Sequence, residues 1–459
     1  MGVRPSAGAV RLARFAALVL GCSSILSSAV AGEPAAAPTY HKDVRPILQA
    51  RCVTCHRKDQ VGPFALETYE QAKKRSHDLA TVAEDRSMPP WKADGKFGPA
   101  LKHDPSLTEA QITTLRAWAD ADAPRGEPVV SEEAPAPKAS NSPWLLGEPD
   151  VVLEMQEDFT VPATGSDLYR CFVIPSRLSR DVYVSAIEYL PGNRRAVHHL
   201  MAFVDLHGNG RIRDKAEAGP GYTSYSGAGV PIDGDLGGYA AGNQVEHLPN
   251  GVGRLIQSGA DVILQVHYHP TGKPEVDRTK IGLHLCRKPV EQSIHWANAT
   301  NDRFRIPAGE SNFEVKATWH VPVDVEALGV TPHMHQVGRD FRMTAVLPNG
   351  SVVNLLDVPQ WDPSWQHTYY FQERVTLPKG TQVKVVAHFD NSAHPRNPHS
   401  PPRAITWGPS VSDEMLVGYI GVVKKGQDLT RSSEKDDLFE ILCRQYMRKL
   451  NRERYASRP

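Results

Sequence analysis

The sequence has no net charge and, beyond Leu26, no long apolar run. Lys and Arg together number 52, as do Asp and Glu, so the formal charge is zero. This balance offers no electrostatic basis for binding nucleic acid or an anionic membrane surface, and neither is expected as a partner. No later segment approaches the roughly 18 consecutive apolar residues of a membrane-spanning helix, so we expect no transmembrane segment in the mature chain. A helical His-Glu-x-x-His motif is also missing, which argues against a zinc hydrolase.

The N-terminal residues 1–31 are typical of a signal peptide. Arginines precede an apolar stretch over residues 15–26, and Ala29-Val30-Ala31 supplies the small residues of a cleavage site. We therefore predict that the protein is exported to the periplasm. As an alternative, Cys22 could carry the lipid anchor of a lipoprotein, although the bulky Leu20 does not favour it.

Residues 40–125 have a helical pattern and contain the motif CVTCH. Cys52, Cys55 and His56 have the Cys-x-x-Cys-His spacing of covalent haem c attachment. The two thiols would add to the haem vinyl groups, and the adjacent imidazole would become the proximal ligand of the iron. A redox-active Cys-x-x-Cys with an incidental histidine is the alternative, but an exported chain with helical sequence after the motif favours haem. We therefore predict a small all-α domain that resembles a monohaem cytochrome c and holds one haem c.

The second axial ligand of this haem is predicted to be Met88. It lies in the sequence DRSMPPW, where two prolines favour a loop, and a thioether ligand suits electron transfer. His77 and His103 are the alternatives. A final helix is expected to start at a Ser106/Glu109 capping box and to cover the haem edge with its apolar side.

The rest of the chain is predicted to be all-β. Residues 126–146 are rich in Pro, Ala, Ser and Glu and are predicted to be a linker. Short alternating runs such as EVKATWHV and QVKVVAHFD then follow, separated by turn residues, which is typical of antiparallel sandwiches. We predict two such domains, over residues 147–295 and 296–430. Residues 431–459 are predicted to form an amphipathic helix that packs on a sandwich.

Histidines recur at two-residue spacing on two of the predicted strands. In DVILQVHYH, His267 and His269 share the face opposite an apolar one, because successive side chains of a strand alternate between faces. In PHMHQ, His333 and His335 share a face, and Met334 is expected to point into the core. Two imidazoles on one face can converge on one ion, and neutral imidazole suits copper, zinc or iron.

The adjacent pair His198-His199 does not fit a regular strand. Neighbouring residues point to opposite faces, so both can bind one metal only where a bulge or a strand end turns one of them. For His388, in VVAHFDN, and for His269 a contribution to a metal site stays open, with a structural role preferred for His388. The remaining isolated histidines have no partner at ligand spacing and are expected at the surface or hydrogen-bonded in the core: His207, His284, His295, His320, His367, His394 and His399.

Together these stretches resemble the copper- and ascorbate-dependent monooxygenases, the family of peptidylglycine α-hydroxylating monooxygenase and dopamine β-monooxygenase. The resemblance covers residues 147–425 and implies two eight-stranded antiparallel sandwiches, each holding one copper ion. VHHLMAF and LQVHYH resemble the segments that bind the first copper, and PHMHQVGR and SDEM resemble those that bind the second. By position, the resemblance assigns the first copper to His198, His199 and His267. It assigns the second, catalytic copper to His333, His335 and Met415.

The resemblance also implies the chemistry. In the family, the three-histidine copper stores and relays an electron. The His₂Met copper binds and activates O₂, which hydroxylates a C–H bond of the substrate. An external donor, ascorbate or a redox protein, supplies the electrons. We therefore expect an exported copper-dependent monooxygenase with two copper ions and one haem c, acting on an unidentified small organic substrate.

Two substrate contacts of the peptide-hydroxylating members are missing here. An arginine of those members is replaced by Thr331 and an asparagine by Val417, whereas a tyrosine is retained as Tyr419. A C-terminal peptide glycine is therefore not the expected substrate. Those members also have no fused cytochrome, so we hypothesise that electrons arrive through the haem of residues 40–125.

A second hypothesis is an electron-transfer or copper-binding protein without oxygenase turnover. An open His₂Met site favours O₂ chemistry, whereas a closed four-ligand site favours a relay. Export also permits disulfides. The sequence does not decide the pairing of Cys171, Cys286 and Cys443, and a Cys171–Cys286 bridge is one option.

Overall fold

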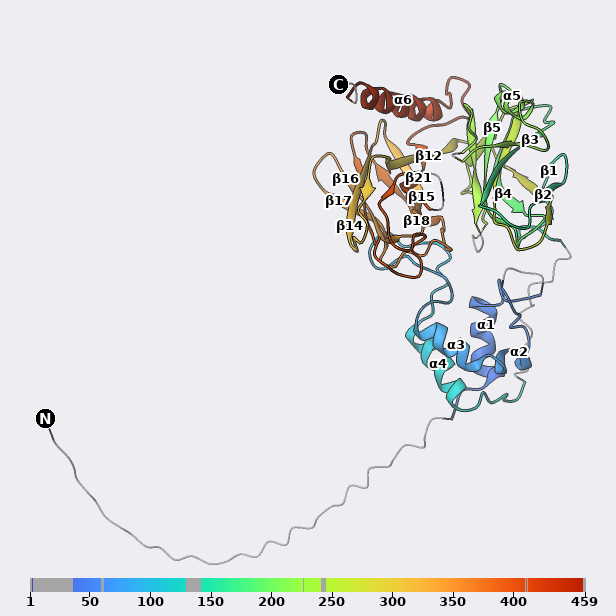
Figure 1. Ribbon diagram of the computed structural model, residues 1–459, viewed down its shortest axis with the longest axis vertical. Helices are drawn as coiled ribbons and strands as arrows, with labels where there is room; N and C mark the ends of the chain where they lie inside the picture. The colour runs from blue at the N-terminus through green and yellow to red at the C-terminus, as the bar shows by residue number, and fades with distance from the viewer. Residues whose placement is uncertain are drawn as a thin grey trace, which may run out of the picture. The chain divides into compact units, whose positions relative to one another are not determined.

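The computed structural model describes residue 2 and residues 36–58, 62–128, 142–225, 227–240, 245–408, 410 and 412–456. The predicted signal peptide, Cys22 included, and most of the predicted linker lie outside the described residues. The described chain is mostly β, with several sheets (Figure 1). None of its described helices is both long and apolar enough to cross a membrane.

The helices of the N-terminal part have a small core of their own. They are η1 (Tyr40–Val44), α1 (Arg45–Arg51), α2 (Tyr69–Lys73), α3 (Ser76–Glu84) and α4 (Glu109–Asp120). Ile112, Leu115 and Trp118 recur at helical spacing on α4 and are buried together with Leu48 of α1. The amphipathic pattern therefore packs these helices against one another, as the sequence predicts.

Helix α4 is capped two residues later than predicted. The Thr108 hydroxyl accepts the backbone N–H of Gln111, and the Gln111 side chain accepts the N–H of Thr108. The predicted Ser106/Glu109 box is therefore wrong. The N–H of Ser106 donates instead to the Asp104 carboxylate at 2.8 Å.

The first β-sandwich is built from two facing sheets. One side consists of β1 (Val151–Glu154), β11 (Lys280–Leu285), β4 (Val182–Leu190) and β8 (Val252–Ile256), in that order. The other side consists of β6 (Tyr222–Thr223), β3 (Leu168–Pro175), β9 (Asp261–Tyr268), β5 (Val197–Asp205) and β7 (Gly234–Ala240). The remaining elements are the pair β2 (Phe159–Val161) and β10 (Glu275–Asp277) and the helix α5 (Asn209–Asp214). Leu264, Val266 and Tyr268 of β9 are buried in the core between the sheets, as their alternation predicts.

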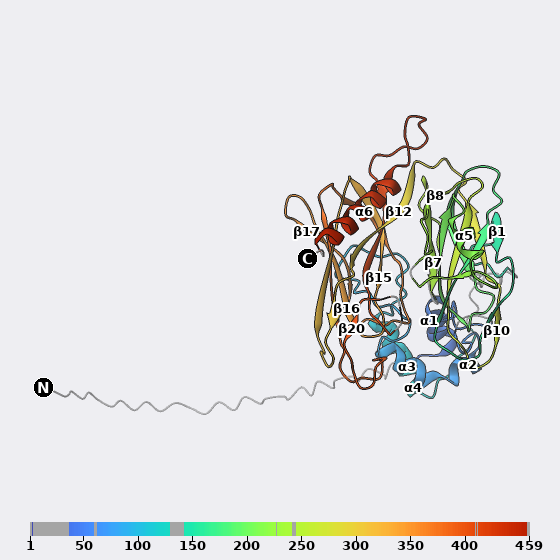
Figure 2. The same ribbon diagram turned by 45° about the horizontal axis from the view of Figure 1, so that its top comes forward.

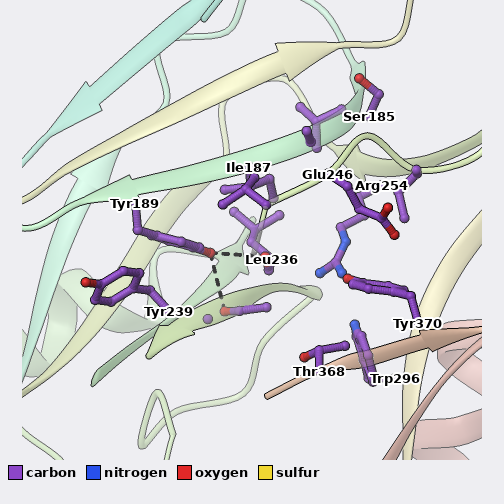
Figure 3. Close-up of a pocket in the computed structure, with 16 residues that line it drawn as sticks. Ser185, Ile187, Tyr189, Leu236, Tyr239, Glu246, Arg254, Trp296, Thr368 and Tyr370 are labelled. Atoms are coloured by element: carbon purple, nitrogen blue, oxygen red, sulfur yellow. Dashed lines mark hydrogen bonds between the residues drawn. The ribbon is translucent and has the colours of Figure 1, made fainter. Parts of the chain in front are cut away.

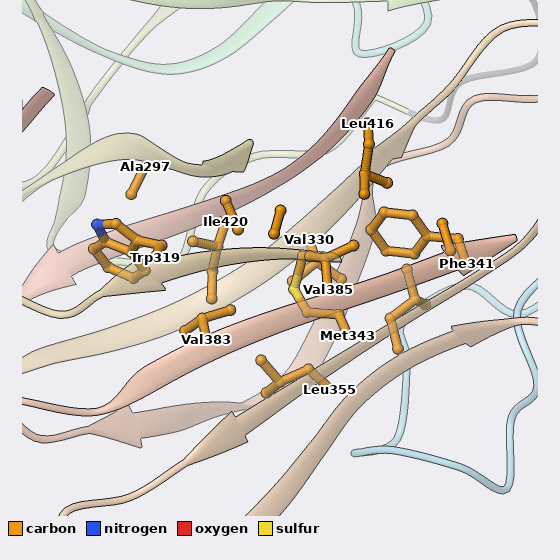
Figure 4. Packing of buried hydrophobic residues seen from close by; sticks show 14 of the residues in the cluster. Ala297, Trp319, Val330, Phe341, Met343, Leu355, Val383, Val385, Leu416 and Ile420 are labelled. Carbon is orange, nitrogen blue, oxygen red and sulfur yellow. The ribbon is translucent and has the colours of Figure 1, made fainter. Parts of the chain in front are cut away.

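The second β-sandwich follows the same plan. One side consists of β12 (Gln292–Asn301), β21 (Leu416–Lys424), β15 (Val325–His333) and β18 (Tyr369–Leu377), in that order. The other side consists of β14 (Phe313–His320), β19 (Gln382–Phe389), β16 (Gly338–Val346) and β17 (Val352–Val358), and β13 (Arg305–Ile306) pairs separately with β20 (Ile405–Thr406). Figure 4 shows Trp319, Met343 and Val385 packed in the core of this sandwich.

The two sandwiches share one continuous sheet. Strand β8 pairs in parallel with β12, through Val252 with Gln292 and Gly253 with Ser293, and this joins the two halves into eight strands. The predicted boundary at residues 295–296 therefore falls inside β12. The two main sheets of the second sandwich contain four strands each, which matches the predicted eight strands. The main sheets of the first sandwich contain four and five strands, because β6 is added to the second of them.

The segment between α3 and α4 is anchored on the second sandwich. Leu101 forms an isolated antiparallel bridge with Phe371. Trp91 packs edge-on against Tyr369, with 4.9 Å between the ring centroids. Residues 40–125 are therefore not a purely helical unit, because part of this range is held by β18.

The C-terminal helix α6 (Leu438–Ala456) packs on the second sandwich, as predicted. Leu438 and Leu442 are buried in its core, and the Trp319 indole N–H donates to the Gln445 side chain at 3.0 Å. Figure 2 shows α6 beside β12.

The five described cysteines are free thiols. Cys171 is fully buried on β3, whereas Cys286 follows β11 in the opposite sheet of the sandwich. The predicted Cys171–Cys286 bridge is therefore wrong.

Candidate metal centres

Three imidazoles meet at neighbouring ends of β5 and β9. The Nδ1 atoms of His198 and His199 are 3.1 Å apart, and those of His199 and His267 are 3.2 Å apart. Ligand nitrogens of all three rings lie within 4.8 Å of one another. Nitrogens around a tetrahedral ion are spaced by about 3.3 Å, so this cluster could bind a metal ion.

A β-bulge brings the two adjacent histidines together. The register of β5 and β9 pairs Val197 with Tyr268 and then His199 with His267, so His198 is the extra residue. A bulge breaks the strict alternation of side chains. The predicted requirement for such an irregularity is therefore confirmed.

Asp167 fixes the orientation of His267. One carboxylate oxygen lies 2.9 Å from Nε2 of His267, and the other lies 2.8 Å from Nδ1 of His269. The hydrogen bond to His267, first among several causes, lowers the pKa of Asp167 to about 2. The ionised carboxylate therefore holds the His267 proton on Nε2 and leaves Nδ1 free to face His199. Tyr169 on β3 stacks on the same imidazole, with 4.2 Å between centroids.

The environment keeps imidazoles of this cluster neutral. His198 is exposed to solvent, yet partial desolvation and then the nearby His267 lower its pKa to about 4. Desolvation also holds the pKa of His199 well below its ordinary value. Neutral imidazole is the form that binds a metal, so these rings need not release a proton at neutral pH.

His333 and His335 form a second histidine pair at the end of β15. Their ring centroids are 5.2 Å apart, with the planes at 85°. Nδ1 of His333 lies 2.6 Å from the Gln366 side-chain oxygen, and Nδ1 of His335 lies 3.1 Å from the Asp413 carbonyl oxygen. Both rings therefore donate from Nδ1 and leave Nε2 free as a ligand atom. Met334, between them, is fully buried, as predicted.

The backbone of Met415 lies near the end of the strand that carries His333. The antiparallel register of β15 and β21 ends with His333 opposite Val417, and Met415 stands two residues before Val417 and just outside β21. That its thioether joins the two imidazoles stays a prediction.

A buried carboxylate ties the two segments together. Glu414 accepts the backbone N–H groups of His335, Val337 and Met415 at 2.8, 2.7 and 3.2 Å. Its side chain is fully buried, and desolvation raises its pKa to about 8 in spite of these bonds. Glu414 therefore fixes the backbone of His335 relative to that of Met415.

The two histidine groups influence each other electrostatically. His333 and His335 contribute to the lowered pKa of His199, and His267 contributes to that of His335. The two groups belong to different sandwiches, so the fold brings these parts of the two sandwiches within electrostatic range of each other.

The CVTCH segment has features that fit a haem. Cys52 and Cys55 are free, half-buried thiols at the end of α1. Nδ1 of His56 lies 3.1 Å from the Phe64 carbonyl oxygen, which leaves Nε2 available to an iron. A Cβ on Gly62 would lie 2.7 Å from the Cys55 carbonyl oxygen, so this close approach requires glycine.

The axial role of Met88 stays a prediction. Met88 is half-buried after α3, and its N–H donates to the Val82 carbonyl at 3.2 Å. Of the alternatives, His77 is exposed, and His103 has its Nε2 2.7 Å from the Glu246 carboxylate.

Several histidines outside these sites are structural, as predicted. His388, His284 and His295 each bond to a carboxylate, at 2.7, 2.8 and 2.9 Å. His269 bonds to Asp167 and is not part of the three-histidine cluster.

The sequence did not point to the residues that orient the ligands. These are Asp167, Tyr169, Gln366 and Glu414. None stands in a local motif, although Glu414 directly precedes the predicted ligand Met415.

No protein-family model matches this chain, and no curated protein matches it. Among solved structures, it is similar to the VP2 subviral particle of infectious bursal disease virus, at 8% identity and a TM-score of 0.19, over 60% of this chain and 71% of that chain. It is also similar to BuGH86wt in complex with neoagarooctaose, at 11% identity and a TM-score of 0.14, over 61% of this chain and 34% of that chain. Scores this low carry no argument about function.

Proposed function

We propose that this protein is an exported copper-dependent monooxygenase that hydroxylates a C–H bond of a small organic substrate with O₂. Residues 40–125 would carry a haem c that donates the electrons. The proposal rests mainly on one observation. Each sandwich has a histidine site in which hydrogen bonds orient imidazole rings and leave one ring nitrogen free to bind a metal. His267, His333 and His335 all have this arrangement.

The donor sets favour copper. His198, His199 and His267 would hold one ion. His333, His335 and Met415 would hold the other, and a thioether beside two imidazoles favours copper over zinc. When bound, the copper ions would supply one-electron redox chemistry and a site for O₂.

The chain's own residues would position these groups. The Asp167 carboxylate holds a proton on Nε2 of His267, and the Gln366 side chain holds one on Nδ1 of His333. Glu414 fixes the spacing between His335 and Met415 through their backbone N–H groups. Such supporting hydrogen bonds keep the ligand atoms aimed at one centre.

The CVTCH segment would serve as the electron donor. Cys52, Cys55 and His56 would hold the haem, which would supply single electrons. The hydrogen bond of the His56 Nδ1 to the Phe64 carbonyl oxygen, at 3.1 Å, supports this role because it leaves Nε2 available to the iron.

Oxygen consumption by the copper-loaded, haem-bearing protein tests the proposal. With ascorbate as reductant, the wild type should consume O₂, and Met415→Ile should abolish this consumption while the haem spectrum stays intact. Met447→Ile is the matched control, because Met447 is exposed on α6. Consumption that survives in Met415→Ile would refute the role of this thioether. An inactive wild type would favour an electron-transfer protein.

A further inference from the structure

A cleft lies where strands of the two sandwiches come together. Its cavity has a volume of about 100 Å³ and opens to solvent. Strands β4, β7 and β8 line it from the first sandwich. Trp296 of β12, Thr368 and Tyr370 line it from the second (Figure 3).

Arg254 brings unused hydrogen-bond donors to this cleft. The residue is only 8% exposed. A guanidinium has five N–H donors, yet among the described residues its acceptors are only the carbonyl and carboxylate oxygens of Asp235, both 3.5 Å away. Figure 3 shows the guanidinium directed into the cleft, toward Tyr370. A buried cation with such long contacts has room for a closer anionic partner.

Trp296 brings a second unused donor from the opposite wall. Its indole N–H is buried and has no hydrogen-bond partner among the described residues. The Arg254 guanidinium carbon lies 6.0 Å from the centre of its ring. An indole N–H only donates, and a buried one usually finds an acceptor. Two donors from two sandwiches therefore lie at one cleft, and its described residues offer them no close acceptor.

The other charged groups at the cleft do not remove the preference of Arg254 for an anionic ligand. Glu246 also lines it, but its carboxylate is already paired with Lys102 at 3.3 Å and with His103 at 2.7 Å. The Asp235 carboxylate accepts the Gly237 N–H at 2.8 Å, closer than its contact with the guanidinium. Of these three charged groups, the Arg254 guanidinium therefore has the longest contacts.

The rest of the lining consists mostly of aliphatic and small residues, with three tyrosines among them. Tyr189, Tyr239 and Tyr370 contribute rings, and Leu236 contributes an apolar surface (Figure 3). The Tyr189 hydroxyl is already engaged, since it donates to the Leu236 carbonyl at 3.0 Å. An apolar lining that includes several aromatic rings favours an apolar body in the ligand, and a flat one can lie against those rings.

We propose that this cleft binds a small carboxylate with a flat apolar body. The carboxylate would accept from the Arg254 guanidinium and the Trp296 indole N–H. The Thr368 hydroxyl lies 2.8 Å from that of Thr331, two residues before His333, so one lining residue contacts the strand that carries His333. That the bound acid is the substrate rests on the proposed function; the binding site itself does not.

Calorimetry on the full-length, haem-bearing and copper-free protein tests the site. Phenylacetate is the probe, and phenylacetamide is its uncharged counterpart of the same shape. The acid should bind at least about tenfold more tightly than the amide, because a hydrogen-bonded charge is lost in the amide. Equal affinities, or no binding of the acid, would overturn the proposal.

Variants identify the donors. Arg254→Gln should abolish the difference between acid and amide, whereas Arg287→Gln should keep it, because Arg287 is exposed and pairs with Asp150. Trp296→Phe keeps an aromatic ring but removes the N–H. It should weaken binding of the acid several-fold and leave binding of the amide almost unchanged. If Arg254→Gln does not fold, the proposal is tested by Trp296→Phe and by the comparison of acid and amide in the wild type. An unchanged affinity of Trp296→Phe for the acid would overturn the role of the indole. Because no copper is present, failure of oxygenase activity and failure of this site are measured separately.

Discussion

The Asp167 carboxylate accepts the Nε2–H of His267 at 2.9 Å and turns the Nδ1 of that ring toward His199. Asp167 is not one of the three clustered ligands, yet it decides which nitrogen of His267 is available. The position of a proton on one ring thus depends on a residue far away in the sequence.

Asp167→Asn should weaken copper binding at the three-histidine cluster by about 10–100-fold. An amide can offer an N–H to Nε2 and so favour the tautomer whose Nδ1 carries the proton. Competition with a copper(I) chelator measures the affinity. Asp158→Asn is the control, because Asp158 is exposed and, among the described residues, pairs only with Arg278, at 3.4 Å. An unchanged affinity in Asp167→Asn would contradict the role of this carboxylate.

The copper-free protein should lose stability as the pH falls below about 6.5. Desolvation and then His333 lower the pKa of folded His335 to about 3, whereas an unfolded histidine titrates near 6.5. The unfolded state therefore binds the proton first, and the stability present above pH 6.5 is lost between 6.5 and about 3. His335→Gln should reduce the loss between pH 7 and pH 4.5 by about 2 kcal/mol, as measured by urea unfolding. Equal losses in the two proteins would show that His335 is not held neutral.

The haem should be oxidised through the copper sites. When ascorbate-reduced protein is mixed with O₂ in a stopped-flow instrument, the reduced haem band should decay in the copper-loaded form. In the copper-free form it should persist, because the haem then has no bound acceptor. If the haem stays reduced while the copper-loaded protein consumes O₂, electrons reach the copper by another route.

Strand periodicity was sufficient to predict much of the candidate site. Alternation placed His333 and His335 on one face and Met334 in the core, and the core burial of Met334 is confirmed. The same rule showed that His198 and His199 could not share a centre without a bulge, which the structure contains. Periodicity succeeds here because it acts within one strand.

The supporting residues depend on contacts between distant parts of the chain. Asp167 and His267 are 100 residues apart, and Glu414 and His335 are 79 apart. Neither pair leaves a local pattern, so only the register of the folded sheets brings them together. The parallel pairing of β8 with β12, which joins the sandwiches, was missed for the same reason.

The position of the α4 cap was missed for a local reason. Ser106 and Thr108 are both good capping residues, and each has a suitable residue three positions later. The Asp104 carboxylate engages the Ser106 N–H, and the helix begins after Thr108. The sequence pattern alone could not rank the two.

The metal content of the purified haem protein tests the central claim most directly. Elemental analysis, referred to the haem measured by its absorption, should give two copper ions per haem. His198→Ala should lower this ratio to one and leave the haem bound. Zinc in place of copper, or no metal besides iron, would contradict the assignment of the two histidine sites to a copper monooxygenase.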